Sequence, residues 1–153
     1  MSEQILMLLI KYEKTLADLY SVCASTFPIH AHFWNNLSKE EEKHAQIIER
    51  LCHSINGSTV YLEKDRFKVR PVEISIEYAE ELILRAKQGN LSLLEALSIS
   101  NSIETSVIET YYYTIFGGES SNLNSYFKQL KDESKVHRDK LQELLEKERK
   151  NKF

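Results

Sequence analysis

Ionisable residues interrupt the apolar stripes of four predicted helices, at positions where a helical bundle usually carries leucine. In the first stripe Leu9, Glu13 and Leu16 follow one another in steps of four and three, the spacing of a helix face that points into a core. Burial of such groups costs free energy unless something compensates them, and a bound cation is one standard compensation. The pattern therefore indicates a buried metal site. Its candidate residues are Glu13, Glu41, His44, Glu104 and His137.

The spacing within this set suits a site for two metal ions. Glu41 and His44 lie three residues apart, so both can turn to one side of a helix and bind one ion. A dinuclear carboxylate site takes one glutamate from each of two helices and a Glu-x-x-His pair from each of the other two. The set fills five of these six places, and Ser134 stands in the sixth, three residues before His137. Because a serine hydroxyl is a neutral and weak ligand, the second half of the site lacks one charge and one expected bridge.

The same residues also allow an interpretation without metal. Three carboxylates and two histidines can pair in a hydrogen-bonded, partly protonated network. Glu133, next to Ser134, is interpreted as a solvated residue beside the site, and the alternative is that it turns inward as a substitute ligand. Tyr20 and Tyr111 each follow a glutamate of the set by seven residues. They either bind these carboxylates or pack as ordinary core aromatics.

Long helices separated by few turns are predicted to position the set. They span about residues 3–26, 31–54, 92–116 and 121–150, with a shorter helix at 75–87. Ser92 and Glu95 form a capping-box pattern, and residues 58–72 are expected to be irregular, with 59–62 extended. More than thirty residues separate the second and third long helices, so the bundle needs one long crossover. We therefore expect an all-α, ferritin-like four-helix bundle whose crossover contains a short extra helix, with residues 1–153 as one domain.

Composition argues against several other classes of protein. The 153 residues include 20 basic and 23 acidic side chains, and the formal charge of −3 argues against a dedicated nucleic-acid surface. No apolar run approaches the ~20 residues that span a bilayer, and the first residues lack a signal-peptide pattern. Cys23 and Cys52 form no CxxC pair and are expected to stay reduced. These features predict a cytoplasmic protein with neither a membrane segment nor a nucleic-acid partner.

Two pairs of segments resemble a known family. Residues 13–20 and 33–44 resemble the first half of a rubrerythrin-type, ferritin-like protein, and residues 103–111 and 130–137 resemble the second half. The resemblance covers about residues 5–145. It implies a homodimer with a non-haem di-iron centre that reacts with peroxide or oxygen, or oxidises ferrous iron. The ligands that it implies are Glu13, Glu41, His44, Glu104 and His137.

Two departures from the family pattern keep several functions open. Ser134 replaces a glutamate, and no rubredoxin-like cysteine pair follows the bundle, so an external electron donor is expected. The leading hypothesis is a redox protein with one or two iron ions, or zinc or manganese instead, and rubrerythrin-like peroxidase or ferroxidase activity. One alternative is a degenerate bundle with a structural or interaction role. Another is a bundle that holds a single non-redox ion such as zinc.

Overall fold

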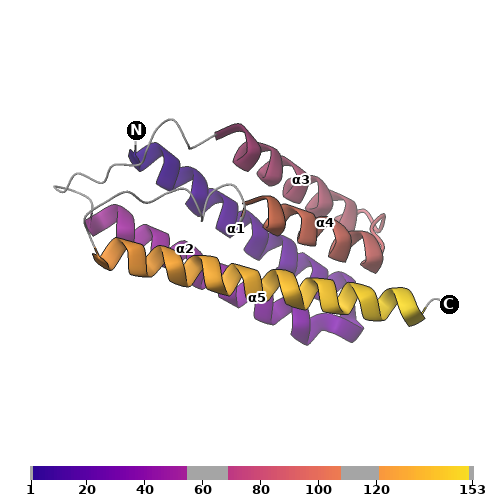
Figure 1. Cartoon of the computed structure of the whole chain (residues 1–153). Coiled ribbons are helices and arrows are strands. Elements are labelled where there is room, and N and C mark those ends of the chain that lie inside the picture. The colour runs from indigo at the N-terminus through magenta and orange to yellow at the C-terminus, as the bar shows by residue number, and fades with distance from the viewer. Residues whose placement is uncertain (1, 55–68, 108–120, 152–153) are drawn as a thin grey trace.

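The computed structural model describes residues 2–54, 69–107 and 121–151 of the chain (Figure 1). All of its elements are helical: α1 (Ser2–Thr26), a short 3-10 turn η1 (Pro28–His30), α2 (Ala31–Ser54), α3 (Val69–Lys87), α4 (Leu93–Val107) and α5 (Ser121–Asn151). The bounds of α1, α2 and α5 agree with the predicted helices to within one residue.

Helices α1, α2, α4 and α5 form the bundle, and α3 is the helix of the crossover (Figure 1). The pair α1 and α2 meets at the η1 corner, α4 lies against α5, and α3 packs on both α1 and α4. Because α3 runs back along the length of the bundle, α4 begins at the same end as α2 (Figure 1). This path is the predicted long crossover, and it confirms the ferritin-like connectivity.

The predicted apolar stripes face the core. The stripe of α1 that contains Glu13 is buried from Leu6 to Cys23, and the stripe of α2 is buried from Trp34 to Leu51. A buried hydrogen bond also joins the two helices, because Ser38 Oγ donates to the Ala17 carbonyl at 2.8 Å. The stripes therefore direct the ionisable residues inward together with their apolar neighbours.

The structure also shows the state of the two cysteines and whether any described helix could span a membrane. Burial raises the pKa of the Cys23 thiol to about 12, so this side chain is a neutral part of the core. No disulfide joins Cys23 to Cys52. None of the described helices is long and apolar enough to cross a membrane.

The crossover helix is longer than predicted. Helix α3 has 19 residues and begins at Val69, inside the stretch expected to be irregular. Pro71 favours that expectation, yet it is the third residue of the helix, in the first turn, where an N–H has no carbonyl partner to lose. The predicted extended residues 59–62 and the last part of the 92–116 helix, 108–116, lie outside the described residues.

Specific capping interactions end α3 and begin α4. Gly89 has a φ of 71°, and the N–H groups of Gly89 and Asn90 donate to the carbonyls of Ala86 and Arg85 at 3.1 and 2.8 Å. This is a Schellman ending, which glycine favours because it has no Cβ. At the start of α4 the Glu95 N–H donates to Ser92 Oγ at 3.2 Å, and the Ser92 N–H donates to Glu95 Oε1 at 3.3 Å. The predicted capping box is confirmed.

The capping box should contribute measurably to stability. We expect Ser92→Ala to lower the free energy of unfolding by about 1 kcal/mol, since it leaves the Glu95 N–H without its side-chain partner. Chemical denaturation measures the difference. Ser102→Ala is the control, because this exposed serine of the same helix donates only to the Ser98 carbonyl one turn earlier. Equal losses in both variants would contradict a capping role for Ser92.

Candidate metal centre

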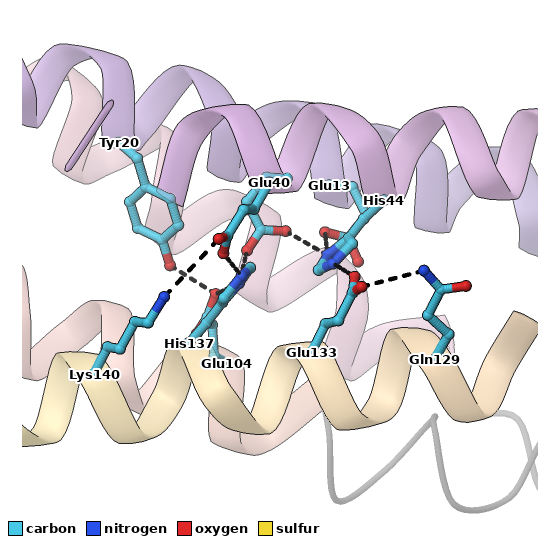
Figure 2. Close-up of polar contacts among 10 residues, drawn as sticks. Glu13, Tyr20, Glu40, His44, Glu104, Gln129, Glu133, His137 and Lys140 are labelled. Carbon is cyan, nitrogen blue, oxygen red and sulfur yellow. Dashed lines mark hydrogen bonds and ion pairs between the residues drawn. The ribbon is translucent and has the colours of Figure 1, made fainter. Parts of the chain in front are cut away.

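All five predicted ligands meet inside the bundle. Figure 2 labels Glu13, His44, Glu104 and His137 among them. Each of the four bundle helices supplies at least one of them, and none is more than 3% exposed. We call this set the candidate centre; it consists of Glu13 on α1, Glu41 and His44 on α2, Glu104 on α4 and His137 on α5. The five residues that the sequence analysis grouped therefore lie together in the core, and their role as metal ligands stays a prediction.

Glu41 lies at the middle of the candidate centre. Its Oε1 is 2.8 Å from His137 Nδ1, and its Oε2 is 3.3 Å from His44 Nδ1. The two imidazole rings stack with their centroids 5.2 Å apart and their planes 18° from parallel. One carboxylate therefore contacts two imidazoles from different helices, each through a different oxygen.

The other two carboxylates complete two similar halves around Glu41. Glu13 Oε2 lies 3.7 Å from His44 Nδ1, and Glu104 Oε1 lies 3.7 Å from His137 Nδ1. Each half thus contains one imidazole, one carboxylate of its own and one oxygen of Glu41. Among the described residues, one ligand atom each from Glu41, His44 and His137 lie within 4.8 Å of one another, close enough to bind a single ion as well.

Two outer carboxylates hold the opposite sides of the imidazoles (Figure 2). Glu133 Oε2 on α5 lies 2.7 Å from His44 Nε2, and Glu40 Oε2 on α2 meets His137 Nε2. Each outer carboxylate therefore contacts a histidine on the opposite helix: Glu133 of α5 contacts His44 of α2, and Glu40 of α2 contacts His137 of α5. Both are partly exposed, with side-chain exposures of 45% for Glu133 and 36% for Glu40.

Sequence reasoning missed Glu40 and did not predict the partner of Glu133. Glu133 lies half exposed beside the site, as predicted, and it also contacts the outer nitrogen of His44. The internal repeat contained the signal for both residues. Glu40 precedes Glu41 by one position, and Glu133 precedes Ser134 by one position in the matching segment.

Tyrosines also reach the candidate centre. The Tyr20 hydroxyl donates to Glu104 Oε1 at 2.9 Å. Of the two roles predicted for Tyr20, the structure therefore shows the contact with a carboxylate. Tyr12, which the sequence reasoning overlooked, is buried nearby. Burial and the carboxylates of Glu13 and Glu104 raise the pKa of Tyr12 well above its usual value. Tyr111 lies outside the described residues.

The electrostatics of the candidate centre favour charged imidazoles in the absence of metal. Burial alone would lower the pKa of His44, but the carboxylates of Glu13 and Glu41 outweigh burial and raise that pKa to about 12. In the same way Glu104 and Glu41 raise the pKa of His137 to about 10, against the effect of burial. Burial and the neighbouring Glu13 raise the pKa of Glu41. Protons thus balance part of the buried negative charge, and a cation could replace them.

The donor atoms fit a transition metal. Carboxylates with imidazoles are a ligand combination that suits iron, manganese or zinc. Glu104 Oε2 is buried and has no hydrogen-bond partner among the described residues, so a buried acceptor is left for a cation or a proton.

A hollow of about 200 Å³ opens beside His137, lined by Glu40, Lys43, Glu133 and Val136. Ser134 is buried one turn before His137, so α5 brings no carboxylate inward at that position.

The raised histidine pKa values predict how stability depends on pH. Both folded pKa values exceed the ordinary 6.5, so protonation of His44 and His137 stabilises the fold. This stabilisation is complete below pH 6.5 and is lost as pH rises through about 10 and then about 12. For metal-free protein we expect the free energy of unfolding to fall by at least about 1 kcal/mol between neutral pH and the pKa of His137.

Denaturation of chelator-treated protein across this pH range measures the effect. His137→Gln should show a smaller fall, because it removes the group that titrates first. His32→Gln serves as the control, since His32 is exposed on α2 and hydrogen-bonds Asn36. A stability that is constant over this range in the unmodified chain would show that the imidazoles are not charged in the fold.

A comparison with known families agrees with this geometry. The family model described as rubrerythrin matches residues 5–145, a range that includes the candidate centre and both outer carboxylates. No curated protein and no solved structure matches the chain. Because the family match runs over nearly the whole bundle, the chain belongs to the rubrerythrin family.

Proposed function

We propose that this chain is a non-haem iron protein whose candidate centre binds two ions and reacts them with peroxide or oxygen. The observation that carries the proposal is the position of Glu41, which presents one oxygen to each of two imidazoles. Such a carboxylate can bridge two cations. Glu13 with His44 would complete one ion site, and Glu104 with His137 would complete the other.

The outer carboxylates support the proposal because they orient the histidines. An imidazole that donates from Nε2 to a carboxylate has its Nδ1 available as a metal ligand. Glu133 and Glu40 occupy this position at His44 and His137. Both Nδ1 atoms accordingly face the inner carboxylates, where the ions would lie.

The chain's own residues set what such a centre could do. Bound ferrous iron would supply the electrons that reduce peroxide or oxygen. Carboxylates favour the harder oxidised ion, and imidazoles bind both oxidation states. With Ser134 on α5, the ions would receive no bridging carboxylate from that helix, and a small oxidant would enter through the hollow beside His137. Electrons would then return from an external donor.

A second candidate function is a single non-redox ion that stabilises the bundle. It is favoured by the three donor atoms of Glu41, His44 and His137, which lie within 4.8 Å of one another and suffice for one zinc ion. A bundle without metal, acting as a structural or interaction module, is the remaining alternative. In that case a variant with both His44→Ala and His137→Ala would keep partner binding intact.

Anaerobic loading with ferrous iron tests the proposed function. We expect more than one ion and up to two ions per chain in the unmodified protein, and about one or fewer in His44→Ala, which loses the imidazole of one half. Iron is measured by elemental analysis together with the optical spectrum after peroxide is added. His32→Ala is the matched control, because this histidine lies on the same helix but is exposed.

Each outcome assigns one of the functions. Fewer than about 0.5 ions per chain, or a count unchanged by His44→Ala, would contradict an iron centre at this site. A colourless protein purified with one zinc ion would favour the non-redox ion. Protein purified without metal that also fails to bind iron would favour the structural module.

Restoring a carboxylate on α5 tests the role of Ser134. If the missing charge limits metal binding, Ser134→Glu should raise iron occupancy toward two ions per chain, because the added carboxylate can serve as the second bridge. Ser106→Glu is the control, since it adds the same charge at an exposed position of α4. The same rise in both variants, or no rise in Ser134→Glu, would show that Ser134 does not border the ions.

A further inference from the structure

Two oxidisable aromatic side chains extend from the candidate centre through the core. The Tyr20 hydroxyl donates to Glu104 Oε1 at 2.9 Å, and the Tyr20 ring lies beside the Trp34 ring with centroids 5.6 Å apart. Both side chains are 0% exposed. Trp34 is the only tryptophan in the chain. Tyr20 is hydrogen-bonded to a carboxylate of the candidate centre and contacts a tryptophan. This arrangement could carry one electron at a time.

The pathway continues toward the surface at the corner between α1 and α2. Phe33 meets the Trp34 ring edge-on with centroids 5.2 Å apart, and Phe27 lies at 6.4 Å. Both phenylalanines are only partly buried, and Ile29 in the adjoining turn η1 is 93% exposed. Trp34 therefore lies between the candidate centre and a corner of the bundle that an external electron donor can reach.

We propose that Tyr20 and Trp34 form a one-electron relay between the candidate centre and this corner. The relay deepens the proposed function and rests on it, because peroxide or oxygen reacting at the centre supplies the oxidant. Aromatic packing alone accounts for the ring contacts. It does not account for the hydroxyl of Tyr20, which is directed at Glu104.

The electrons and protons of the relay balance. Tyr20 gives one electron to the oxidised centre, and its phenolic proton moves to Glu104, leaving a neutral tyrosyl radical. Trp34 then gives one electron to Tyr20, whose oxygen takes the proton back from Glu104. An external one-electron donor finally reduces the Trp34 radical cation. The net change is one electron from the donor to the centre, and every proton returns to its starting atom.

The surroundings of Trp34 decide where the radical rests. Trp34 Nε1 is buried without a hydrogen-bond partner among the described residues, so an oxidised indole keeps its proton and its positive charge. A charged radical in the apolar core costs free energy, whereas Tyr20 becomes neutral by passing its proton to Glu104. The radical is therefore more stable on Tyr20. The step from Trp34 to oxidised Tyr20 runs uphill and is drawn forward when the external donor reduces the Trp34 radical cation. Without a donor, an oxidised Trp34 should take an electron from Tyr20.

Laser photoionisation of the metal-free chain tests this electron transfer. Excitation at the long-wavelength edge of the indole absorption, where tyrosine does not absorb, makes the starting radical specific to Trp34, the single tryptophan. The absorption of the tryptophan radical should then decay as that of a tyrosyl radical rises. Tyr20→Phe keeps the ring but removes the hydroxyl, so it should slow the decay by about a hundredfold or more, as expected when a positioned proton transfer is lost. Tyr78→Phe is the control, since it removes the hydroxyl of a tyrosine that is exposed on α3.

The relay is wrong if the Trp34 radical yields no tyrosyl radical, or if Tyr20→Phe decays as fast as the unmodified chain. This experiment contains no metal, so its result is independent of the iron count that tests the proposed function. In iron-loaded protein treated with peroxide, Trp34→Phe should lengthen the life of the tyrosyl signal seen by electron paramagnetic resonance. An unchanged lifetime, or no tyrosyl signal in either protein, would overturn the role of the relay at the centre.

Discussion

The carboxylate of Glu41 lies between two buried imidazoles, and the candidate centre depends on this contact. Its oxygens are 2.8 and 3.3 Å from the Nδ1 atoms of His137 and His44, whose rings stack 5.2 Å apart. Two charged rings at that separation repel each other in a medium of low dielectric constant. Glu41 offsets the repulsion, and because the histidines come from α5 and α2, it also links the two helix pairs of the bundle.

The other charges of the site are arranged in two layers around the imidazoles. Inner carboxylates from α1 and α4 face the Nδ1 atoms, and the outer carboxylates Glu40 and Glu133 face the Nε2 atoms near the surface. Protons on the imidazoles satisfy this arrangement without metal, and cations can satisfy it in their place. The helix pairs differ in one respect, since α2 supplies the bridging glutamate and α5 has Ser134 at the matching position.

The spacing of residues along each helix was sufficient to predict most of the fold and which ionisable residues are buried together. Glu13, Glu41, His44, Glu104 and His137 were predicted from their stripes, and all are buried together. The start of α3 was predicted too late, because Pro71 is compatible with the first turn of a helix as well as with an irregular segment. Glu40 was missed because a surface glutamate beside a stripe resembles any solvated residue.

The sequence by itself determined which residues face the core, because helical periodicity assigns each side chain to one face. It also determined that one half of the repeat lacks a carboxylate, at Ser134. Only the tertiary structure decided what lies across from each face. Residues next to the stripe point about 100° away from it, and whether they meet a partner depends on how neighbouring helices are placed. For this reason the crossed contacts of Glu40 and Glu133, and the contact between Tyr20 and Trp34, emerge only in the folded bundle.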